Sequence, residues 1–142
     1  MKKLLFVCTG NTCRSPMAQA VFNSEAEKLN IDAVAISRGL CADKSPASKN
    51  AITALSEIGI CNFEHKSATV TYEDIENADY VIGITSGHTA NLISTFPRYC
   101  DKIYSFPTDI SDPYGGNIDV YRKTLFEIVD GVKSIIDEVF PR

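Results

Sequence analysis

The stretch Leu4–Phe22, "LLFVCTGNTCRSPMAQAVF", contains three successive patterns that decide the fold. Leu4–Val7 is a short apolar run typical of a buried strand, and residues 8–14 form a polar loop that holds two cysteines and an arginine. A helical pattern follows, with Ser15 predicted as its N-cap and Pro16 as its first residue. A strand, a tight loop and a helix in this order are typical of an α/β protein.

The same alternation of strand and helix continues along the chain. Further strands are predicted at residues 33–37, 80–84 and 102–106, and further helices at 45–59, 71–78, 86–96 and 118–140. Ser45 with Pro46, and Thr71, are the expected starts of two of these helices. The pattern predicts a single-domain, three-layer α/β fold over residues 1–142, with a four-stranded parallel sheet flanked by helices. Ligands bind such sheets at the carboxyl ends of the strands, where the loop after Val7 lies.

The composition of the 142-residue chain is that of one globular domain, with 44% hydrophobic and 23% charged residues. Its net charge of −4 argues against a nucleic-acid partner, since binding to phosphate backbones needs clustered Lys and Arg. No apolar run approaches the ~20 residues of a membrane span, and the apolar run at the N-terminus is too short for a secretory signal. The five scattered cysteines are expected to be reduced. We therefore expect a cytoplasmic protein without a membrane partner.

Several kinds of ligand site are disfavoured for the loop at residues 8–14. Cys8 and Cys13 are too few to hold a metal ion, and His65 and His88 have no neighbours at zinc-finger spacing. Nucleotide and dinucleotide loops need Gly-x-x-x-x-Gly-Lys-Ser/Thr or Gly-x-Gly-x-x-Gly, whereas Gly10 stands alone in this loop. We expect neither a metal nor a cofactor.

A cysteine nucleophile in an anion cradle fits the loop better. The backbone N–H groups of a loop that turns into a helix converge on one centre, and the helix dipole adds positive potential there. This field favours the thiolate of Cys8, the form that attacks phosphorus. Arg14 can hold two phosphoryl oxygens with its planar fork. Gly10 permits a left-handed backbone and Asn11 tolerates one, so the loop can close tightly.

Two motifs carry a family resemblance that covers essentially the whole chain. "CTGNTCRSP", which begins at Cys8, resembles the Cys-x5-Arg phosphate loop of the low-molecular-weight protein tyrosine phosphatase family, located after the first strand. Asp112-Pro113-Tyr114 resembles the general-acid loop of that family, located before the last helix. The resemblance implies a flavodoxin-like sheet, a phosphocysteine intermediate, and Cys8, Arg14 and Asp112 as catalytic residues. By composition alone, "DPYGG" is only a turn.

The resemblance also implies roles for neighbouring residues. The expected phosphate-binding residues of the loop are Thr9, Gly10, Asn11, Thr12, Cys13 and Ser15. Ser37 and His65 are expected to support this loop through Asn11, although His65 also fits a purely structural or exposed histidine. Cys13 can trap Cys8 as a disulfide, or act only as a small buried residue. His88 is expected at the surface, and the three remaining cysteines, Cys41, Cys61 and Cys100, are expected to be structural.

Thr12 bears most directly on the substrate. Tyrosine-specific members of the family usually carry an aliphatic residue at this loop position, whereas members that act on phosphoarginine carry threonine. The resemblance therefore implies a phosphatase for phosphoarginine in proteins, with Thr12 and Tyr114 contacting substrate and Asp112 able to pair with the guanidinium. A phosphotyrosine phosphatase is the main alternative. An arsenate reductase would need redox cysteines near residues 82–89, and a phosphate-binding module without turnover would not need all three catalytic residues.

Overall fold

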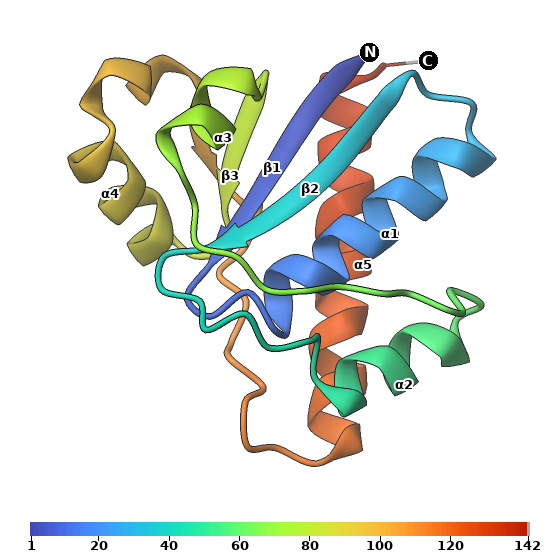
Figure 1. The fold of residues 1–142 in the computed structure, drawn as a ribbon. Helices are drawn as coiled ribbons and strands as arrows, with labels where there is room; N and C mark the ends of the chain where they lie inside the picture. The colour runs from blue at the N-terminus through green and yellow to red at the C-terminus, as the bar shows by residue number, and fades with distance from the viewer. Residues whose placement is uncertain (142) are drawn as a thin grey trace.

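The computed structural model describes residues 1–141, and its strands form one parallel sheet in the order β2-β1-β3-β4 (Figure 1). The strands are β1 (Lys2–Cys8), β2 (Ala33–Gly39), β3 (Tyr80–Gly83) and β4 (Ile103–Ser105). The predicted four-stranded parallel sheet is therefore confirmed. The chain passes from β1 to β2 on one side of β1, and then from β2 to β3 on the other side. The carboxyl ends of β1 and β3 therefore meet at a topological switch point, the place where such folds bind ligands.

Strand β1 is buried on both faces and separates two hydrophobic cores. Leu4 and Phe6 belong to one core, whereas Leu5 and Val7 belong to the other, because successive side chains point to opposite faces of a strand. The ring of Phe6 lies 6.3 Å from that of Phe22 in the first core. The apolar run that predicted a buried strand thus forms the centre of a three-layer structure.

Helices cover both faces of this sheet, α1, α2 and α5 on one side and α3 and α4 on the other (Figure 1). They are α1 (Arg14–Lys28), α2 (Lys49–Glu57), α3 (Tyr72–Asn77), α4 (Ser86–Thr95) and α5 (Ile118–Val139), with a short 3-10 helix η1 (Pro97–Lys102) before β4. Within residues 1–141, none of these helices is both long and apolar enough to cross a membrane.

Two predicted helix starts are wrong. Helix α1 begins at Arg14, so Ser15 is not its cap; the Ser15 hydroxyl instead lies 2.9 Å from Cys8 Sγ. Helix α2 is capped by Ser48, because the chain at Ser45 first forms backbone hydrogen bonds with the segment near residue 66. The predicted cap at Thr71 is confirmed, since its hydroxyl accepts the N–H of the third residue of α3.

Candidate active site

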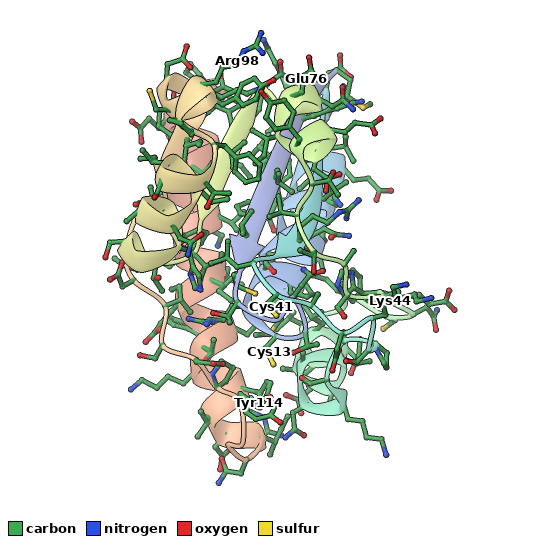
Figure 2. All side chains as sticks on the ribbon, turned by 60° about the vertical axis from the view of Figure 1, so that its left-hand side comes forward. Cys13, Cys41, Lys44, Glu76, Arg98 and Tyr114 are labelled. Carbon is green, nitrogen blue, oxygen red and sulfur yellow. The ribbon has the colours of Figure 1, made fainter. Side chains whose placement is uncertain are left out.

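A cavity of about 400 Å³ opens at the carboxyl end of β1. Figure 2 shows Cys13, Cys41 and Tyr114 gathered at this end of the molecule. The residues that line it are Cys8, Thr9, Gly10, Asn11, Thr12, Cys13, Arg14, Cys41, Ala42, Asp43, Ser45, Asp112 and Tyr114. The structure thus brings together the two segments, far apart in sequence, that carry the predicted catalytic residues.

The thiol of Cys8 lies at the base of this cavity and is only 3% exposed. Its Sγ is 2.9 Å from the hydroxyl oxygen of Ser15, which sits in the first turn of α1. A thiolate has no proton to donate, so in the ionised state the Ser15 hydroxyl donates to sulfur. This bond places the Cys8 sulfur beside the first turn of α1, where the helix dipole presents positive potential.

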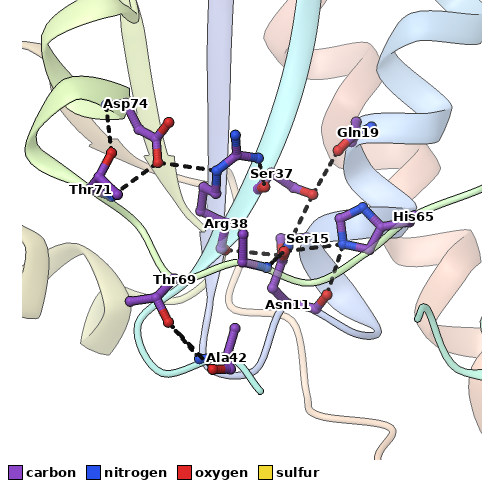
Figure 3. A network of polar contacts seen from close by, with 11 residues as sticks. Asn11, Ser15, Gln19, Ser37, Arg38, Ala42, His65, Thr69, Thr71 and Asp74 are labelled. Carbon is purple, nitrogen blue, oxygen red and sulfur yellow. Dashed lines mark hydrogen bonds and ion pairs between the residues drawn. The ribbon is translucent and has the colours of Figure 1, made fainter. Parts of the chain in front are cut away.

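Asn11 is fully buried and holds the phosphate loop, residues 8–15, in its curved shape (Figure 3). Its side-chain amide donates to the hydroxyl oxygens of Ser15 (2.9 Å) and Ser37 (3.0 Å), and its Oδ1 accepts the N–H of Ala68 (3.1 Å). Asn11 has a positive φ of 59°, whereas Gly10 does not. Of the two residues that allow a left-handed backbone, asparagine takes this conformation, and its side chain is bonded on both sides.

His65 braces the same residue from the other side. Its Nε2 lies 3.0 Å from the carbonyl oxygen of Asn11 and 3.1 Å from its Oδ1; both atoms are acceptors, so the ring nitrogen donates. Burial is the main cause that lowers the pKa of His65, and Arg38 lowers it further, against the hydrogen bond to Asn11. The structure brings Ser37 and His65 to Asn11, as predicted.

The neighbouring backbone packs closely against the phosphate loop. The carbonyl oxygens of Cys8 and Thr9 accept hydrogen bonds from the backbone N–H groups of Leu40 and Cys41, so the chain after β2 holds the loop at these two positions. Gly39 lies so close that a Cβ at this position would be 2.7 Å from the carbonyl oxygen of Thr9. A side chain at Gly39 would therefore displace the phosphate loop.

Arg14 links the phosphate loop to the segment that carries the predicted acid. Its guanidinium donates to the carbonyl oxygen of Ile110 at 3.0 Å and lies 3.7 Å from Asp112 Oδ2. Arg14 is buried, whereas the side chain of Asp112 is 54% exposed at the mouth of the cavity. A guanidinium has five N–H donors, so these two contacts leave donors for phosphoryl oxygens.

Cys13, the second cysteine of the loop, faces a tyrosine that the sequence did not indicate. Its Sγ lies 3.3 Å from the hydroxyl of Tyr121 in α5 and 3.6 Å from that of Ser48. Burial, and then the hydrogen bond to Cys13, raise the pKa of Tyr121 to about 12. The phenol therefore keeps its proton and can donate it to this sulfur.

Two expectations, one for His88 and one for three cysteines, are wrong. His88 is buried, not at the surface, and its Nε2 lies 2.9 Å from the hydroxyl oxygen of Thr9. Thr85 caps α4 and His88 is its third helical residue, so the bond of His88 back to the cap follows a local pattern, whereas its contact with Thr9 does not. The cysteines expected to be structural, Cys41, Cys61 and Cys100, are exposed.

The described residues contain no group of three or more His, Cys, Asp or Glu side chains that could hold a metal ion. The arrangement instead offers a buried thiol, a guanidinium beside it and a carboxyl group across the cavity mouth. These are the groups needed for nucleophilic transfer of a phosphoryl group with proton donation to the leaving group.

Residues 3–140 match the model of the family described as "Low molecular weight phosphotyrosine protein phosphatase". The chain belongs to this family. Its relatives include a protein-arginine-phosphatase from Bacillus subtilis, 37% identical over 96% of this chain and 95% of that protein. The low molecular weight protein-tyrosine-phosphatase PtpB of Staphylococcus haemolyticus is 35% identical over 89% of this chain and 92% of that protein.

The fold of this phosphatase is also shared with solved structures of its relatives. One is a YwlE arginine phosphatase mutant with a phosphorylated active site serine. It superposes with a TM-score of 0.92 at 36% identity, over 98% of this chain and 96% of that chain. The overall fold is therefore that of a family member.

Proposed function

We propose that this family member is a protein phosphatase that hydrolyses phosphoarginine through a phosphocysteine intermediate. The observation that carries the proposal is Thr12, which lines the cavity within the phosphate loop. Its hydroxyl can hydrogen-bond to a guanidino nitrogen or to the attacking water, whereas an aliphatic side chain would leave those polar groups unpaired. The relative named protein-arginine-phosphatase supports the same substrate class.

The charges around the cavity mouth also favour a guanidino substrate. The carboxylates of Asp43 and Asp112 both line the cavity, and Arg14 is the one basic residue among the lining residues described above. Hydrogen bonds from Ser45 lower the pKa of Asp43, so its carboxylate is ionised at neutral pH. Carboxylates at the cavity mouth and the buried guanidinium of Arg14 inside it suit a substrate that carries a negative phosphoryl group on a positive side chain.

The first chemical step transfers the phosphoryl group to sulfur. The thiolate of Cys8 attacks phosphorus while Arg14 holds the oxygens, and the P–N bond of phosphoarginine breaks. Asp112 gives its proton to the leaving nitrogen, so arginine departs as the stable guanidinium. The mutant relative with a phosphorylated active site serine supports a covalent intermediate on the nucleophile.

The second step releases phosphate. The Asp112 carboxylate takes a proton from water, the water oxygen attacks phosphorus, and the S–P bond breaks. The electron pair returns to Cys8 as a thiolate, which Ser15 stabilises at 2.9 Å. Neither step uses a metal or a cofactor.

A pair of near-isosteric variants tests the substrate. Thr12→Val removes the hydroxyl and keeps the shape, whereas Thr12→Ser keeps the hydroxyl. We expect Thr12→Val to lower kcat/KM for a phosphoarginine protein about tenfold or more, and Thr12→Ser to retain most of it. The kcat/KM for phosphotyrosine peptides should change little in either variant. A wild-type preference for phosphotyrosine, unchanged in Thr12→Ile, would contradict the proposal.

The second candidate is a phosphotyrosine phosphatase. The observation in its favour is Tyr114, whose ring lines the cavity mouth and is 80% exposed, available to stack on an aromatic substrate. The tyrosine phosphatase PtpB supports it as a relative. Comparison of the two phosphorylated substrates in the same assay decides between the candidates, and the expected loss of both activities in Cys8→Ser excludes a phosphate-binding module.

We extend the proposal to the cell compartment and the substrates of the enzyme. A nucleophilic thiol must stay reduced, and the five cysteines are free, which supports a cytoplasmic enzyme. Residues 1–142 act as one domain on phosphorylated proteins. The net charge of −4 supports substrates other than nucleic acids.

A further inference from the structure

The first turn of α4 contacts the segment that carries the acid. The backbone N–H of Ser86 donates to Asp109 Oδ1 at 2.9 Å, and the Ser86 hydroxyl donates to Oδ2 at 3.0 Å. Asp109 lies three residues before Asp112 in the chain between β4 and α5. Two donors on one carboxylate, at the positive end of a helix, hold this segment against α4.

The same turn contacts the phosphate loop through His88. The N–H of Thr85 donates to His88 Nδ1 at 3.2 Å, so Nδ1 is unprotonated and the ring proton is on Nε2. Nε2 therefore donates to the hydroxyl oxygen of Thr9, 2.9 Å away and adjacent in sequence to Cys8. Because His88 is buried and bonded at both nitrogens, it fixes the loop relative to α4.

The charged groups around His88 are consistent with a neutral ring. Burial is the main cause that lowers its pKa, and the positive charge of Arg14 lowers it further. Asp112 and Asp109 act in the opposite direction and are outweighed. At neutral pH the ring thus keeps the single proton that the bond to Thr9 requires.

These contacts differ in kind from the direct link that Arg14 makes. Arg14 also joins the phosphate loop to Ile110, but it lines the cavity, and its remaining donors serve the phosphoryl oxygens in the proposed mechanism. Ser86 and His88 lie two residues apart on one helical turn and outside the lining of the cavity. Their bonds can persist through the reaction.

We infer that Ser86, His88 and Asp109 are positioning residues that hold Asp112 at proton-transfer distance from the leaving group above Cys8. The inference rests on the role of Asp112 in the proposed function. Loss of this link misplaces the acid without removing the nucleophile or the anion cradle. The loss should therefore be large for substrates with poor leaving groups, which need the proton, and small for those with good ones.

The experiment uses the full chain with phenyl phosphate, a poor leaving group, and 2,4-dinitrophenyl phosphate, a good one. The measured quantity is kcat/KM, which reports the first phosphoryl transfer. Asp109→Ala, at an exposed residue, should lower kcat/KM for phenyl phosphate about tenfold and change that for the dinitrophenyl ester less than twofold. Asp109→Asn keeps an acceptor for the Ser86 N–H and should recover much of the loss.

Three further variants make the test specific. Ser86→Ala with Asp109→Ala should lose no more than Asp109→Ala alone, because both remove one interaction. Thr95→Ala, at the other end of α4, is the control and should leave kcat/KM for both esters unchanged. Asp112→Asn removes the acid itself, so its loss of kcat/KM is the value with which the losses of the other variants are compared.

Each outcome has a defined meaning. Equal losses on both esters in Asp109→Ala, or no loss on either, would overturn the inference and leave the proposed function standing. An Asp112→Asn variant without leaving-group dependence would overturn both the inference and the mechanism. A wild type that cleaves aryl phosphates but not phosphoarginine would overturn only the phosphoarginine assignment, and the inference would still be decided by the two esters.

Discussion

The two segments that form the cavity are built in opposite ways. The phosphate loop is buried: Asn11 and Ser15 have no exposed surface, and their side chains bond to each other and to neighbouring strands and loops. The segment at residues 107–117 is open, with Asp112 half exposed and Tyr114 80% exposed. The nucleophile and the anion cradle are thus fixed in advance by the fold, whereas the acid lies at the entrance, where a leaving group must pass.

The largest expected effect comes from the buried side of this comparison. Cys8→Ser replaces the thiolate with a hydroxyl that is far less acidic, so kcat should fall by about 10⁴-fold or more. The fold should persist, because serine is smaller and Ser15 can still hydrogen-bond to it. Steady-state kinetics with thermal unfolding checks both points. Activity near that of the wild type would show that the nucleophile lies elsewhere.

The open side should separate rate from stability. We expect Asp112→Ala to lower kcat by about 10²- to 10³-fold, the usual size of a general acid–base contribution. Because the side chain is half exposed and its contact with Arg14 is long, at 3.7 Å, the free energy of unfolding should change by less than about 0.5 kcal/mol. Kinetics and urea denaturation of the same preparation measure both. A large loss of stability would contradict the division between the two segments.

Asn11→Ala should affect rate and stability together. The change leaves the Ala68 N–H without its partner, removes one of the two hydrogen bonds of the Ser37 hydroxyl and puts alanine at a positive φ, so we expect a loss of about 2–3 kcal/mol in the free energy of unfolding. Distortion of the loop should also lower kcat/KM about tenfold.

Tyr114→Ala is the matched control for this variant, because it removes a side chain on the open segment. Its free energy of unfolding should equal that of the wild type within about 0.5 kcal/mol. Equal stability losses in the two variants would remove the distinction between a fixed loop and an open segment.

Most of the fold could be predicted from the sequence because its signals are local. The apolar run at Leu4–Val7 and the cap at Thr71 depend on residues close in the chain. The parallel sheet followed from the alternation of strands and helices. Ser45 and Pro46 misled because their backbone pairs with a segment about twenty residues away, which no local pattern reveals.

The candidate site shows the same division. Cys8, Arg14 and Asp112 could be named because motifs mark them, and the structure brings them to one cavity. His88 was missed since its partner, Thr9, lies 79 positions away in the sequence. The sequence likewise indicated Tyr121 only as an apolar position on the last helix, although its hydroxyl contacts Cys13. Tertiary contacts of this kind turn a core residue into part of a site.

The smallest expected effect concerns pH and the two histidines that brace the fixed loop. Burial lowers the pKa of both His65 and His88 below the ordinary value of 6.5, so the folded protein holds them neutral. Between pH 6.5 and 5 the unfolded chain binds protons that the folded chain does not, and stability therefore falls as the pH falls.

The slope of this change can be bounded and assigned. Each histidine contributes at most about 1.4 kcal/mol per pH unit to the free energy of unfolding, and His65, which is partly exposed, contributes less. Urea denaturation at several pH values measures the slope, and His88→Gln should reduce it more than His65→Gln. A protein that becomes more stable from pH 6.5 to 5 would mean that the charged imidazoles are favoured in the fold. Nδ1 of His88 would then carry a proton, against the Thr85 N–H that it now accepts.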